Sequence, residues 1–187
     1  MSTGAAAVFG IVTGFVVLIA ILCIAIYNKL DLLRNTLKSL WSDIDAKLGK
    51  QYALIPGFVK IMRESAPHDD PVFDKVLEGC SIAVRALSPA GKAKAEHSLR
   101  DALNNLFAFA GAHPELQTRT DFSDLRKQLR DVWDSIERAR TSYNAIVRDY
   151  NAIVESFPSS MLASLFKFER MEFFEPESLT SDEGDQK

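Results

Sequence analysis

Residues 5–27 read AAAVFGIVTGFVVLIAILCIAIY, an uncharged apolar run in a chain of 187 residues. An α-helix rises about 1.5 Å per residue, so a helix over this run is long enough to cross a hydrocarbon core of roughly 30 Å. We predict a transmembrane helix over residues 5–27, preceded by a short extracytoplasmic N-terminus of residues 1–4. The alternative interpretation is the buried core helix of a soluble protein.

Basic side chains follow the run directly, at Lys29, Arg34 and Lys38. Cytoplasmic flanks of membrane helices carry an excess of Lys and Arg. We therefore expect a single-pass membrane protein, with the N-terminus outside and the C-terminal domain in the cytoplasm. A cleaved signal peptide is disfavoured because its basic residues would precede the apolar core, and because Ile24–Tyr27 lacks a small-x-small cleavage site.

Small residues recur at every fourth position of the run, at Ala6, Gly10 and Gly14. This spacing permits two membrane helices to approach closely, so these residues are candidates for packing between transmembrane helices. Glycine is common in membrane helices in general, and one such motif is therefore a weak signal.

Beyond residue 27 the apolar residues recur in steps of three and four, which is the period of an amphipathic helix. The predicted helices cover residues 28–62, 72–87, 89–110 and 122–157. Pro56 must kink or end the first of them, because proline removes a backbone donor and clashes with the preceding turn. Ser88 is the expected N-cap of the third, with Pro89 at the first helical position.

No segment alternates with period two over a useful length, so we predict an all-α fold. The transmembrane helix continues into a long antiparallel up-down helical bundle of residues 28–176. Residues 66–71 carry two prolines and separate the first predicted helix from the second. Residues 177–187 are rich in Asp and Glu, and we expect them to form an acidic disordered tail.

The first and fourth predicted helices are similar in length, so the fourth returns to the membrane surface in an up-down bundle. The segment that follows it is rich in apolar and aromatic residues. It docks on the base of the bundle, lies in the lipid headgroup region, or contacts a neighbouring subunit. The candidates for membrane-proximal or oligomer contact are Phe157, Leu162, Leu165, Phe166, Phe168, Phe173 and Phe174.

A polar stripe accompanies the apolar seam of the fourth helix, where two Tyr-Asn pairs seven residues apart share one face. We expect this stripe to meet polar residues of the first helix, with Arg140 paired to an Asp and the asparagines fixing the register. A polar pocket for a small ligand is the less favoured alternative, because no titratable cluster converges there. The residues concerned are Trp41, Asp43, Asp45, Arg140, Tyr143, Asn144, Tyr150 and Asn151.

Composition argues against several functional classes. The formal net charge is -3, and no basic patch with interleaved aromatic residues points to nucleic acid. His68-Asp69-Asp70 is the candidate metal-binding group, but a solvated loop is favoured because adjacent residues do not form a tetrahedral site without distant ligands. The sequence carries no phosphate-binding loop or catalytic triad motif. Cys23 and Cys80 lie in separate apolar contexts and fit packing positions in a reducing compartment. We expect no cofactor, no small-molecule substrate and no enzymatic activity.

Short sequence blocks along almost the whole chain resemble the LemA family of bacterial membrane proteins. They are YNKL at 27–30, LRN at 33–35, WSDID at 41–45, LIP at 54–56, AR at 139–140, YN at 143–144 and 150–151, FP at 157–158, and FFE at 173–175. The resemblance implies a single-pass anchor, a cytoplasmic antiparallel helical bundle and no established enzymatic activity. The family includes a protein needed for building magnetosome membranes, which implies a role in membrane organisation. Ala53, Gly57 and Trp133-Asp134 depart from the polar residues that the family favours there.

Two functions are compatible with these features. The first is a membrane-anchored, self-associating scaffold that organises or shapes the membrane, with lipid and further copies of the chain as partners. The second is a regulatory adaptor that binds another membrane protein, such as a protease or a peptide-processing system. The long amphipathic helices and the aromatic segment favour the scaffold, and the acidic tail favours the adaptor.

Overall fold

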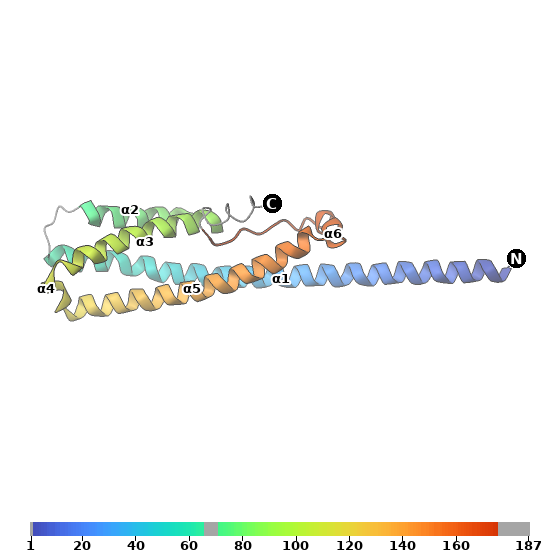
Figure 1. Cartoon of the computed structure of the whole chain (residues 1–187), viewed down its shortest axis with the longest axis horizontal. Coiled ribbons are helices and arrows are strands. Elements are labelled where there is room, and N and C mark those ends of the chain that lie inside the picture. Colours follow the sequence, from blue (N-terminus) through green and yellow to red (C-terminus); the bar gives the residue numbers. More distant parts are fainter. Residues whose placement is uncertain (1, 66–70, 176–187) are drawn as a thin grey trace, which may run out of the picture. The chain divides into compact units, whose positions relative to one another are not determined.

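The computed structural model describes residues 2–65 and 71–175, and the side chains of residues 9–64 and 71–175. All regular secondary structure in these residues is helical, so the predicted all-α fold is confirmed (Figure 1). The helices are α1 (Ser2–Ser65), α2 (Pro71–Arg85), α3 (Pro89–Gly111), α4 (Pro114–Gln117), α5 (Thr120–Glu155) and α6 (Ser159–Leu165). The predicted tail of residues 177–187, residues 66–70 of the predicted interruption at 66–71, and the side chain of Ala6 lie outside the described residues.

Helix α1 continues through Pro56 and ends at Ser65, so the proline does not end the helix. Proline inside a helix costs about 3 kcal/mol because a hydrogen bond is lost. The side chains on both sides of it offset this cost, since Ile55, Phe58 and Met62 are all fully buried. Tertiary packing thus keeps the helix going past a residue that would end an isolated one.

The described residues form two compact units. The first, the anchor unit, contains residues 2–39 and 145–171, and the second, the core unit, contains residues 40–65, 71–144 and 172–175. Helices α1 and α5 each contribute to both units. The predicted helical bundle of residues 28–176 contributes residues to both units, and its bounds as a domain stay a prediction.

Within the core unit the chain runs up and down along α1, α2, α3 and α5 (Figure 1). Ser88 caps α3 by accepting a hydrogen bond from the Gly91 amide at 3.1 Å, and Pro89 occupies the first turn as predicted. The core consists of apolar side chains from every helix of the unit. Its largest fully buried members are Phe58, Phe73, Phe122, Ile55, Met62, Leu99, Leu103 and Leu106.

The anchor unit contains the first part of α1, the end of α5 and α6. Its part of α1 is the candidate membrane span, with a mean hydropathy of 2.9, and none of the residues in that apolar window is buried. A core helix of a soluble protein would be mostly covered by its own chain. The uncovered apolar surface therefore favours the membrane helix over the buried core helix.

Candidate functional site

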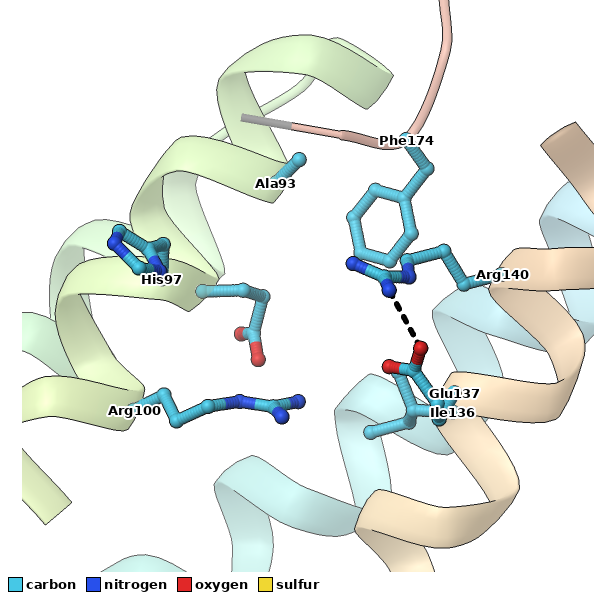
Figure 2. A pocket seen from close by; sticks show the side chains of 8 residues that line it. Ala93, His97, Arg100, Ile136, Glu137, Arg140 and Phe174 are labelled. Carbon is cyan, nitrogen blue, oxygen red and sulfur yellow. Dashed lines mark hydrogen bonds and ion pairs between the residues drawn. The ribbon is translucent and has the colours of Figure 1, made fainter. Parts of the chain in front are cut away.

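A pocket of about 290 Å³ lies between α3 and α5 in the core unit (Figure 2). Helix α3 supplies one wall, α5 supplies the other, and Phe174 closes one end. Figure 2 shows Arg100 reaching from α3 toward α5, whereas Arg140 and Glu137 of α5 are joined by an ion pair. The lining residues are Ala93, Glu96, His97, Arg100, Ile136, Glu137, Arg140 and Phe174.

Glu96 is the chemically most unusual residue of this pocket. Its carboxylate accepts hydrogen bonds from Gln51 Nε2 at 2.8 Å and from Tyr52 Oη at 2.6 Å. Burial raises the pKa of Glu96 above its ordinary value, although these two hydrogen bonds and the charges of Arg100 and Lys92 act in the opposite direction. Burial and the neighbouring carboxylate also raise the pKa of Tyr52. Glu96 therefore ties α3 to α1 through a desolvated carboxyl group.

The raised pKa of Glu96 predicts a pH dependence of stability that Glu96→Gln removes. Between the ordinary pKa of 4.5 and the raised folded-state value, the folded chain binds more protons than the unfolded chain. The Glu96 contribution to stability therefore rises as the pH falls from neutral toward 4.5. We expect the melting temperature of the unaltered protein in mild detergent to rise relative to that of Glu96→Gln over this range. A constant difference across the range would contradict the raised pKa.

The polar residues of α1 and α5 have partners that differ from the prediction. Arg140 pairs with Glu137, one turn earlier on its own helix, and no Asp of α1 pairs with it among the described residues. Asp45 instead binds Lys92 of α3, and Asp43 pairs with Lys47 on α1. The predicted Arg140–Asp ion pair is wrong, because each of these charges finds a nearer partner on its own helix or on α3.

Trp41 lies between two aromatic side chains of the core unit. Its ring centroid is 5.6 Å from that of Tyr143 and 5.6 Å from that of Phe174. Tyr143 also donates a hydrogen bond from its hydroxyl to the Glu172 carbonyl at 3.0 Å. Burial raises the pKa of Tyr143 to about 12. Trp41 and Tyr143 therefore belong to the packing that holds the segment 172–175 in the core unit.

The side chain of Asn144 holds the segment 172–175 by hydrogen bonds to the backbone of Phe174. Its Oδ1 accepts from the Phe174 amide at 2.9 Å, and its Nδ2 donates to the Phe174 carbonyl at 3.4 Å and to Glu175 Oε1 at 2.8 Å. Asn144 is buried, so these groups exchange hydrogen bonds in place of those with water. The side-chain amide of Asn144 thus both donates to and accepts from Phe174, in a segment without regular secondary structure.

Asn151 makes the equivalent pair of bonds within the anchor unit. It accepts from the Met171 amide and donates to the Met171 carbonyl, each at 2.9 Å. The predicted role of the asparagines, to fix the register of α5 against α1, is therefore wrong, because their amide groups bind the chain beyond α6. Tyr150 beside it is fully buried, and its hydroxyl has no hydrogen-bond partner among the described residues. Burial raises the pKa of Tyr150.

Substituting Asn144 by alanine is expected to release Phe174. The change leaves a buried backbone donor and acceptor without partners, which costs about 1–3 kcal/mol. We expect faster hydrogen exchange at the Phe174 amide while exchange in the middle of α3 stays unchanged. Asn35→Ala is the matched control, since Asn35 is exposed and bonds only to Asp31 on its own helix. Equal exchange at Phe174 in both variants would show that Asn144 does not hold the segment.

The aromatic and apolar residues predicted for membrane or oligomer contact separate into two sets. Phe168 and Phe174 are buried within the chain, which for these two rings agrees with docking on the folded domain, the first of the three predicted alternatives. Phe168 packs edge-on against Tyr27 at 5.6 Å, with the Arg34 guanidinium 5.9 Å above its ring. Leu162 and Phe173 are half-buried, whereas Phe157, Leu165 and Phe166 are exposed.

Gly10 and Gly14 are exposed on α1, and a Cβ atom at either position would meet open space. Their packing against a second membrane helix stays a prediction. No three His, Cys, Asp or Glu side chains come together as metal ligands in the part of the chain that the structure describes. Among the charged groups of the pocket in Figure 2, Arg140 pairs with Glu137, and Glu96 accepts hydrogen bonds from Gln51 and Tyr52 of α1. These contacts favour a structural role for the pocket.

The candidate residues predicted from the sequence did not include Glu96, which lines the pocket, or Lys92, one turn away on α3, which binds Asp45. Their signal was nonetheless present, because steps of three and four back from Leu106, Leu103 and Leu99 reach both positions. Charged residues at core-facing positions of a helix indicate buried polar contacts.

Comparison with known proteins places these features in a family. A family model described as the LemA family matches residues 40–184 of the chain. The magnetosome protein MamQ of Magnetospirillum gryphiswaldense is 31% identical over 87 residues. That match covers 46% of this chain and 32% of the relative, so the chain corresponds to about a third of the relative's length.

Proposed function

Because the chain belongs to the LemA family, we propose that it is a non-catalytic, membrane-anchored scaffold. It self-associates through its helices and organises or shapes the bacterial inner membrane. The observation that carries the proposal is the apolar part of α1, which has a mean hydropathy of 2.9 and no buried residue, and which runs without interruption into the helical core. The similarity to a protein named as a magnetosome protein supports a role at a membrane.

The proposed orientation places the N-terminus outside and the helical core in the cytoplasm. Lys29 and Lys38 are exposed on α1 directly after the apolar run, and basic residues on this side favour cytoplasmic retention. Membrane lipid is then the first partner of the protein, and further copies of the chain are the second.

Exposed apolar side chains near the end of α2 support self-association. Leu87 is 92% exposed, Val84 is 54% exposed and Ile82 is 50% exposed. Large apolar side chains that a folded domain leaves exposed are candidates for contact with another protein. We propose that this part of α2 contributes to the contact between copies.

The test is particle size and shape of the full-length protein in mild detergent, by electron microscopy and mass photometry. We expect a discrete closed assembly of many copies. Ile82→Ser combined with Leu87→Ser should shift the particles toward smaller species. Lys75→Ser with Glu78→Ser, at exposed positions of α2, should leave them unchanged. A lone monomer from the unaltered protein would overturn the scaffold.

A regulatory adaptor is the alternative function. In that case the protein binds another membrane protein, such as a protease or a peptide-processing system, and does not assemble with itself. A monomeric particle that gains mass only when membranes of the source organism are co-solubilised would favour the adaptor.

A further inference from the structure

The outward side of α6 carries apolar side chains that the described chain leaves uncovered. Met161 is 68% exposed and Leu165 is 71% exposed, and the two lie one turn apart on the same face of the helix. Phe157, just before α6, is 81% exposed. The opposite face is docked, since Ala163 and Ser159 are buried. One face of α6 thus anchors the helix to the anchor unit, and the other presents apolar surface outward.

This surface is continuous with the end of the predicted membrane span. The ring of Phe166, which follows α6, meets the ring of Tyr27 edge-on at 5.0 Å. Cys23, Ile24, Tyr27 and Phe166 together line one apolar hollow. Tyr27 is the last residue of the apolar run, and tyrosine is enriched where membrane helices meet the headgroup region. Phe166 therefore lies beside the residue at which the predicted span ends.

Basic side chains border the same surface. Lys29 follows Tyr27 by two residues, Lys167 follows Phe166, and both are exposed. Arg170 is also exposed, and its guanidinium pairs with Glu155 at 2.7 Å. Aromatic and apolar residues bordered by lysine are typical of segments that lie in the interface of membranes containing anionic lipid.

We propose that the outward face of α6, with Phe157, lies in the lipid headgroup region beside the transmembrane helix. The chain thus contacts the bilayer at two places, by the span in α1 and by α6. The inference rests on the membrane anchoring in the proposed function and extends it, and it does not require self-association. A bilayer is favoured over a second copy as the occupant because the surface joins the span at Tyr27 and is bordered by lysines.

The depth of α6 can be measured with nitroxide spin labels on the full-length protein. Met161→Cys and Leu165→Cys are introduced separately into a background with Cys23→Ala and Cys80→Ala. Each protein is placed at one copy per nanodisc of phosphatidylcholine and phosphatidylglycerol. Asp134→Cys, at an exposed polar position of the core unit, is the matched control. Electron paramagnetic resonance then compares collisions with oxygen and with a water-soluble nickel chelate.

We expect both labels on α6 to lie about 5–10 Å into the boundary between headgroups and acyl chains, while the control label stays fully open to the nickel chelate. Labels on α6 that are as open to the chelate as the control would overturn the proposal. A parallel sample in larger discs that hold several copies tests the other occupant: α6 labels that are shielded from both reagents and show spin–spin broadening only in that sample would identify a second copy and would also overturn the proposal.

A second variant tests the membrane contact of α6 independently of the membrane contact of the transmembrane helix. Phe157→Ser combined with Leu165→Ser alters exposed side chains, so the helical content should not change. We expect the Met161→Cys label in this variant to become open to the chelate while the protein stays in the membrane. The depth of the spin labels is measured on single copies and so does not depend on self-association. A monomeric particle in electron microscopy would overturn the proposed self-association without affecting the depth measurement.

Discussion

Replacing Phe58 by alanine is expected to lower the free energy of unfolding by about 3–5 kcal/mol. Phe58 is fully buried at the meeting point of three helices of the core unit. Its ring stacks on Phe122 of α5 at 5.3 Å and contacts Phe107 of α3 at 5.2 Å. The alanine variant loses the burial of the ring and leaves a cavity that rigid neighbouring helices fill only in part.

Unfolding of the purified protein in mild detergent, followed by circular dichroism with increasing denaturant, measures this loss. Phe58→Leu retains most of the buried volume and should lose less than half as much. Phe157→Ala removes the same ring from an exposed position, where 81% of the side chain is accessible, and should change little. A loss of less than about 1 kcal/mol in Phe58→Ala would contradict its place at the centre of the core.

Two arginines in the middle of the apolar run, Val16→Arg and Ala20→Arg, are expected to remove the protein from the membrane. On the scale of insertion experiments each arginine at the centre of a span costs about 2.5–3.5 kcal/mol. The insertion cost of the two arginines together exceeds the insertion free energy that several apolar residues of the run contribute. Because both positions are exposed, the core unit should keep its helical structure.

Fractionation of cells followed by a carbonate wash of the membranes measures the result. Val16→Leu with Ala20→Leu, which keeps the run apolar, should stay in the washed membranes. Retention of the double-arginine variant in that fraction would show that α1 does not provide the anchor.

The sequence predicted the long helices of this fold because their apolar residues repeat over many turns. The α3 boundary was also readable, since Ser88 and Pro89 are a strong start signal. The short helices α4 and α6 were missed because 4 and 7 residues are too few to show a period. The apolar period over residues 72–87 predicts one buried face, whereas Val84 of α2 and Leu87, two residues after α2 ends, are exposed.

The candidate site was harder to predict because periodicity gives the face of a helix and not the neighbour of that face. The Tyr-Asn pairs do share a face of α5, yet Asn144 and Asn151 bind the backbone of residues beyond α6. The chain beyond α6 has no regular secondary structure and therefore no repeating pattern of apolar residues. Its position against α5 could not be predicted from such a pattern. Phe166 and Phe168 show the same limit of prediction from periodicity. They are the same residue type two positions apart, yet Phe168 is buried and Phe166 is exposed.

The bonds from Asn151 to Met171 have a consequence for which sequences the segment tolerates. An asparagine amide that both donates to and accepts from one peptide unit recognises the main chain and is indifferent to the side chain attached to it. Position 171 should therefore accept almost any residue in a saturation library. Proline alone should be rejected, because it has no amide hydrogen to offer Asn151.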